Sequence, residues 1–292
     1  MIRTLGLAIS LLFTIVAGAQ DASAPKTLIP LLILDSHHRP VPGVTAASLA
    51  ITEHKVPITN SVNLLTGPAL PLQLGVLIDT SNSESTAGMF FAAVKAVNDF
   101  VRESMRTGDD RVFFEPFSNK PEMTAWLSKE QLAGESLHLK IGGGTALYDA
   151  IAVACADRMG NADRQKPARR VLVVISDGDD NLSDHTRDQA ASLLIGGGVV
   201  MFAVSTGPRQ KTRGEQILTW MANASGGSSF VSLTAADMPR VFATIRALMD
   251  GMYYLSYVPP EPLKKGVHEV EVRPAQGSKF EVSYPRKYLW NP

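Results

Sequence analysis

Asp79, Ser81 and Ser83 stand at alternate positions directly after the apolar segment 72–78. A nearly continuous apolar run of this length predicts a strand that is buried on both faces. Open α/β sheets bind their ligands at the carboxyl ends of such strands. One carboxylate and two hydroxyl oxygens are hard donors, which suit Mg²⁺ or Mn²⁺ better than Zn²⁺. Taken alone, the same residues also fit a capped turn between a strand and a helix.

Two later segments carry the same kind of donor. Thr145 follows the glycines 142–144 and precedes a predicted helix, and Asp177 follows a second apolar run at 170–175. The glycines allow the backbone to approach a ligand, and a phosphate-binding loop is excluded because no lysine follows them. Three loops therefore supply oxygen ligands, and none supplies a pair of a base and a nucleophile.

The segments that connect these loops alternate between strand and helix patterns. Apolar runs predict further strands at 111–117, 199–205 and 229–233. Helical periodicity and breakers predict helices at 89–105, 146–159, 184–195, 214–223 and 235–249. This alternation predicts an α/β fold over residues 70–250, an open, mostly parallel, Rossmann-like sheet with helices on both faces.

The flanks of this region, residues 27–66 and 252–290, have β patterns. The N-terminal flank predicts strands at 27–34, 48–52 and 56–65, with a linker at 64–68. The C-terminal flank predicts a strand at 252–258 and a hairpin of 267–272 with 279–284. Because neither flank, at roughly 40 residues, can bury an adequate core alone, we expect the two to form one small β-sandwich-like domain.

Composition narrows the class of protein. Lys plus Arg is 28 and Asp plus Glu is 28, and this balance argues against a nucleic-acid binder. The single cysteine excludes an intrachain disulfide and a four-thiolate zinc site. Residues 1–19 have the pattern of a cleaved signal peptide, which predicts export to a periplasmic, cell-surface or extracellular location. No later stretch is apolar enough to span a membrane, so we expect no membrane span in the mature chain.

The three loops together resemble the von Willebrand factor A domain and its metal-ion-dependent adhesion site (MIDAS). That family combines an Asp-x-Ser-x-Ser loop, a Thr loop and an Asp-Gly loop around one divalent ion. The matching residues are Asp79, Ser81, Ser83, Thr145 and Asp177. The resemblance covers residues 70–250, and the flanks resemble those of secreted acidobacterial-type proteins of this family. The segment His54-Lys55-Val56 departs from that group, in which a Glu-Asp-Gly-like turn is more usual.

The resemblance implies a binding module rather than an enzyme. Asp79, Ser81, Ser83 and Thr145 would hold the ion directly or through water, and Asp177 would do so in a manner that depends on conformational state. The ion would be Mg²⁺, with Mn²⁺ or Ca²⁺ as alternatives. A protein partner would donate a Glu or Asp carboxylate to the open coordination position.

Two alternatives stay open at this point. The two aspartates could activate a metal-bound water for hydrolysis, although the sequence shows no positioned His or Glu base near either loop. The protein could also have a structural role in envelope assembly with an unused metal site. The six histidines are scattered along the sequence, and the pair His37-His38 fits a solvated turn better than a metal site.

Overall fold

The computed structural model describes residues 27–59, 61–86, 88–134, 139–160, 167–207, 212–259 and 264–290. The predicted signal peptide lies outside the described residues. The strands are β1 (Ile29–Leu34), β2 (Leu49–Glu53), β3 (Val56–Pro57), β4 (Asn63–Thr66), β5 (Leu72–Asp79), β6 (Arg111–Phe117), β7 (Arg169–Ser176), β8 (Val200–Ser205), β9 (Ser228–Phe230), β10 (Tyr253–Ser256), β11 (Gly266–Pro274), β12 (Glu281–Ser283) and β13 (Lys287–Trp290). The α-helices are α1 (Gly88–Ser104), α2 (Leu147–Val153), α3 (Arg187–Gly197), α4 (Arg213–Ala224) and α5 (Met238–Asp250).

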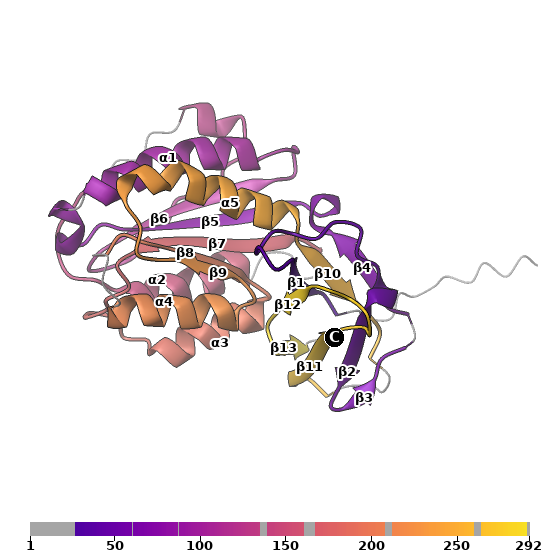
Figure 1. Cartoon of the computed structure of the whole chain (residues 1–292). Helices are drawn as coiled ribbons and strands as arrows, with labels where there is room; N and C mark the ends of the chain where they lie inside the picture. The colour runs from indigo at the N-terminus through magenta and orange to yellow at the C-terminus, as the bar shows by residue number, and fades with distance from the viewer. Residues whose placement is uncertain are drawn as a thin grey trace, which may run out of the picture.

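The central sheet has the order β6-β5-β7-β8-β9, and all its neighbouring strands are parallel. Helices α1 and α5 cover one face, and α2, α3 and α4 cover the other (Figure 1). Strand β7 is buried at every position, as a strand covered on both faces must be. This arrangement confirms the predicted open parallel sheet with helices on both faces.

The flanks form two antiparallel sheets, with the orders β12-β1-β10-β4 and β13-β11-β2-β3. Each sheet combines strands from both ends of the chain, and a separate apolar core lies between them. Ile51, Leu255 and Val272 are among the buried residues of that core. The small sandwich built from both flanks is therefore confirmed as part of the fold class. The exact boundaries of the domains stay predictions.

One sheet of the sandwich also packs against the α/β unit. Leu31 and Leu255 face the sandwich core. Their sequence neighbours Leu32 and Tyr254 point to the opposite face and belong to the core beneath α1 and α5. This explains why β1 is almost uniformly buried, although strands of antiparallel sheets commonly alternate between buried and exposed residues.

Three predicted features of the flanks are wrong. The single strand at 56–65 is two strands, because β3 pairs with β2 and β4 pairs with β10 in the other sheet. The predicted linker at 64–68 includes the end of β4 and a 3₁₀ turn at Gly67–Ala69. The segments 267–272 and 279–284 are not a hairpin, because the turn between them carries the chain from one sheet to the other.

Two further observations complete the fold. The helix predicted at 146–159 begins as α2 and ends as a π-helical segment at Ala154–Met159. Within the described ranges, none of the helices combines the length and apolar character needed to cross a membrane.

Candidate metal centre

The candidate site lies where two adjacent parallel strands end. The chain runs from β5 to β6 on one side and then returns past β5 to β7 on the other, so β5 and β7 flank the topological switch point of the sheet. Ligand sites of open α/β sheets form at such a point. Asp79 is the last residue of β5, and Asp177 follows the last residue of β7.

Asp79 is fully buried and held by two hydrogen bonds. The hydroxyl of Ser176 donates to Oδ2 at 2.6 Å, and the backbone N–H of Ser81 donates to Oδ1 at 3.0 Å. Burial nevertheless raises the pKa of Asp79 to about 6, because the charged form loses more hydration than these bonds return. A cation beside this carboxylate would favour its charged form.

The two serines of the first loop adjoin each other. Ser81 Oγ and Ser83 Oγ lie 3.0 Å apart, with Ser81 buried and Ser83 exposed. Asn82–Thr86 is a 3₁₀ helix, so the loop coils back toward the strand end. The pair of hydroxyls thus reaches from the interior to the surface.

Glu84 is a further candidate ligand that the sequence analysis overlooked. Its carboxylate lies with those of Asp79 and Asp177 in one group, in which the potential ligand atoms are within 4.8 Å of one another. The hydroxyl of Thr206 donates to Glu84 Oε1 at 2.6 Å, while the buried Oε2 has no hydrogen-bond partner in the described part of the chain. Burial and the neighbouring Asp79 raise the pKa of Glu84 to about 8.

The position of Glu84 was visible in the sequence, one residue after the Asp-x-Ser-x-Ser pattern. Its role was not, because only the 3₁₀ coil turns this side chain inward. The expectation that no positioned His or Glu lies near either loop is therefore corrected, because the carboxylate of Glu84 lies beside those of Asp79 and Asp177.

Thr145 lies on a loop that is hydrogen-bonded to both other loops. The N–H of Gly142 donates to Thr80 O at 2.8 Å, which joins the glycine loop to the end of β5. The N–H of Thr145 donates to the side-chain oxygen of Asn181 at 2.9 Å, which joins it to the loop after β7. Thr145 is buried beside these contacts.

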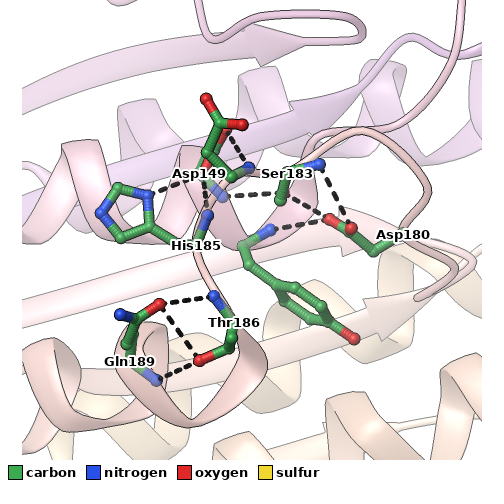
Figure 2. A network of polar contacts seen from close by, with 8 residues as sticks. Asp149, Asp180, Ser183, His185, Thr186 and Gln189 are labelled. Carbon is green, nitrogen blue, oxygen red and sulfur yellow. Dashed lines mark hydrogen bonds and ion pairs between the residues drawn. The ribbon is translucent and has the colours of Figure 1, made fainter.

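The acidic segment after Asp177 stabilises the loops. Asp180 Oδ2 accepts from the N–H of Tyr148 at 3.1 Å, and Ser183 Oγ accepts from the N–H of Asp149 at 3.0 Å, so both satisfy donors in the first turn of α2. In return Asp149 accepts from the backbone of His185 at 2.9 Å (Figure 2). The side chain of Asp180 thus has structural partners in the backbone of Tyr148 and the hydroxyl of Ser183.

Gly178 explains how the loop after β7 reaches this position. Its φ is +86°, and a Cβ at this residue would lie 2.4 Å from the carbonyl oxygen of Gly214. Only glycine combines this backbone conformation with such a close approach. The side chain of Asp177 is consequently placed beside the end of β5, half-exposed.

The donor set fits a hard divalent cation. Carboxylate and hydroxyl oxygens are the ligands that Mg²⁺, Mn²⁺ and Ca²⁺ prefer. Among the ion pairs of the described residues, none joins Asp79, Glu84 or Asp177 to a lysine or arginine. Carboxylates that lie close together without a lysine or arginine beside them repel one another when they ionise. A bound metal ion would offset this repulsion.

Of three comparisons with known proteins, the one with solved structures agrees with this fold. No protein-family model matches the chain. No curated protein matches it either. A solved structure of a von Willebrand factor type A protein from Catenulispora acidiphila matches with a TM-score of 0.51 and 15% identity, over 92% of this chain and 75% of that one.

A second solved structure is proximal thread matrix protein 1 from the mussel byssus, determined with a zinc-occupied MIDAS motif. It matches with a TM-score of 0.52 and 16% identity over 66% of this chain. The chain spans about half of the mussel protein, 49% of its length. At such identities the likeness is one of fold, and the relation to acidobacterial-type proteins stays a prediction. The chain has a von Willebrand factor A-like fold with a MIDAS-like candidate metal centre.

Proposed function

We propose that this protein is an exported, metal-dependent protein-binding module for adhesion or assembly. A divalent ion at the carboxyl edge of the parallel sheet, Mg²⁺ in the first instance, bridges to a Glu or Asp carboxylate of a partner protein. The observation that carries this function is the convergence of the Asp79, Glu84 and Asp177 carboxylates beside the paired serine hydroxyls. The exposed Ser83 and the half-exposed Asp177 leave one side of that group accessible.

The ligands in this proposal are the five residues of the family pattern, with Glu84 added. Asp79, Ser81, Ser83, Thr145 and Asp177 hold the ion directly or through water. Glu84 contributes a third negative charge near the ion. The site binds rather than catalyses, since Glu84 is buried and already accepts a hydrogen bond from Thr206. A base within this buried position has little access to an external substrate.

The first test is calorimetric titration of the protein with Mg²⁺ and Mn²⁺. We expect saturable binding that Asp79→Ala weakens by more than about 100-fold, since even loss of an outer-shell partner of a metal ligand costs 10–100-fold. Asp79→Asn should have the same effect. Its amide oxygen can still accept from the N–H of Ser81, whereas its amide nitrogen, which only donates, loses the bond that Ser176 donates. The matched control is Asp188→Ala, which removes one exposed carboxylate outside the site.

Two results would contradict a metal-dependent module. One is the absence of saturable binding at millimolar ion, which would favour a structural role in envelope assembly with an unused site. The other is binding that Asp79→Asn leaves unchanged. If the metal binds, retention of a partner on immobilised protein should require the ion and fail with the Asp79→Asn variant. Export is tested separately, by whether the mature protein begins at Gln20.

A further inference from the structure

Two of the six histidines meet beside the turn between β2 and β3. His54 lies on the turn between β2 and β3, and His268 lies on β11, which pairs with β2. His54 Nε2 and His268 Nδ1 are 3.0 Å apart, although the residues are 214 positions apart in the chain. The histidines are scattered along the sequence, and the antiparallel pairing of β2 with β11 brings these two together.

A carboxylate completes a group of three donors. Glu53 directly precedes His54, and its potential ligand atom lies within 4.8 Å of those of the two imidazoles. Glu53 is 2% exposed, and the hydroxyl of Tyr288 donates to its Oε1. Its Oε2 is buried without a hydrogen-bond partner in the described ranges. A buried carboxylate is costly to charge, and a cation bound to this group would offset that cost.

A hydrogen bond made by His268 Nε2 determines which nitrogen of this ring can bind a metal ion. His268 Nε2 lies 2.7 Å from the carbonyl oxygen of Lys264. Since a carbonyl oxygen only accepts, Nε2 carries a proton, and Nδ1 is the nitrogen that faces His54 and is available to a metal. Histidines that bind metals almost always donate their other N–H to a carbonyl or carboxylate in this way.

The turn that carries His54 has an unusual backbone. His54 and Lys55 have φ values of +48° and +69°, both in the left-handed region. Two-residue hairpin turns of this kind favour Asn-Gly, because non-glycine residues are strained there. This turn is also where the sequence departs from the group it resembles. This strained turn places the His54 ring next to the ring of His268, with the ring centroids 5.3 Å apart.

We propose that Glu53, His54 and His268 form a second metal site, selective for zinc or a similar transition ion. Two imidazoles and one carboxylate are a common zinc ligand set that leaves one position open for water or an external ligand. Tetrahedral geometry with Zn–N bonds of about 2.05 Å places two nitrogens about 3.3 Å apart, close to the observed 3.0 Å. Nitrogen donors distinguish this site from the all-oxygen group at the sheet edge.

The test uses zinc itself on the full mature chain that carries Asp79→Asn, so that the first site cannot contribute. Calorimetry should show one zinc ion bound per chain. Addition of His54→Asn or of His268→Ala should weaken that binding by more than about 100-fold. Asn is favoured in the left-handed turn, so His54→Asn should preserve the fold. His37→Ala, which removes an exposed histidine of another turn, is the matched control.

Co²⁺ provides a second readout that reports the ligands directly. Bound to the Asp79→Asn protein, it should give the visible absorption of a tetrahedral ion, and His268→Ala should abolish that absorption. Two results would overturn the second site. One is an Asp79→Asn protein that binds no zinc, which would leave the histidines as a purely structural pair. The other is zinc affinity that survives both histidine substitutions. Neither result depends on whether the carboxylate centre binds Mg²⁺.

Discussion

At the scale of single residues, the buried carboxylates of this protein differ in how many hydrogen bonds stabilise their charged form. Asp110 is buried, which by itself would raise its pKa, but the N–H groups of Leu72, Arg106 and Thr107 donate to it and hold its pKa below the ordinary value. Glu115 on β6 is also buried, yet neither of its oxygens has a hydrogen-bond partner within the described ranges. Burial raises the pKa of Glu115 to about 8, against a partial opposing effect of Arg158.

This shift makes stability depend on pH. Below the ordinary value of 4.5, Glu115 is protonated in both states and contributes no pH dependence. Between that value and about 8, the unfolded chain releases the proton and the folded chain retains it, so stability falls as pH rises. The loss of stability is complete above the folded pKa and is on the order of 5 kcal/mol.

Glu115→Gln should remove this penalty, because the amide resembles the protonated acid and does not titrate. In urea unfolding, we expect the variant to match the parent near pH 4 and to exceed its free energy of unfolding by a few kcal/mol near pH 9. Glu122→Gln, at an exposed position nearby, should follow the parent throughout. Parallel pH profiles for Glu115→Gln and the parent would show that Glu115 is ionised in the folded protein at neutral pH.

At the scale of elements, β5 depends on a residue without a side chain. A Cβ on Gly75 would lie 2.4 Å from Leu172 of β7 and 2.5 Å from Phe113 of β6. Gly75→Ala should therefore destabilise the protein by about 1–3 kcal/mol, as overpacking of a core does. Gly88→Ala at the start of α1, where a Cβ has open space, should be neutral or stabilising by up to about 1 kcal/mol. Chemical denaturation compares the two, and equal stability would disprove the crowding around β5.

The sequence predicted the elements of the parallel sheet because each carries its own signal. The apolar runs that became β5 and β7 are buried on both faces, and their terminal aspartates follow from the topology of such sheets. The flanks were less predictable. The short β3 and β4 read as one strand, since periodicity does not report which sheet a strand joins. Glu84 and the His54–His268 pair depend on a 3₁₀ coil and a cross-strand register, which local patterns do not reveal.

At the scale of the whole molecule, the sheet β12-β1-β10-β4 contributes residues to two cores, that of the sandwich and that beneath α1 and α5. Leu32 and Tyr254 complete the core beneath α1 and α5, and Leu31 and Leu255 complete the sandwich core on the opposite face. The α/β unit cannot lose this sheet without exposing apolar residues of its own core. Asp250 at the end of α5 adds an ion pair with Arg106 close to the start of β10.

Because one sheet belongs to both cores, we expect the described parts of the molecule to unfold together. Calorimetry of the mature protein should give one transition with equal calorimetric and van't Hoff enthalpies. Leu255→Ala, which opens a cavity in the sandwich core, should cost about 2–5 kcal/mol and lower that single transition by roughly 5 °C or more. If Leu255→Ala instead produced a separate early transition and left the main one unchanged, the sandwich would be an independent domain. We expect a single shifted transition because separation of β10 from β1 also removes Tyr254 from the core beneath α1 and α5.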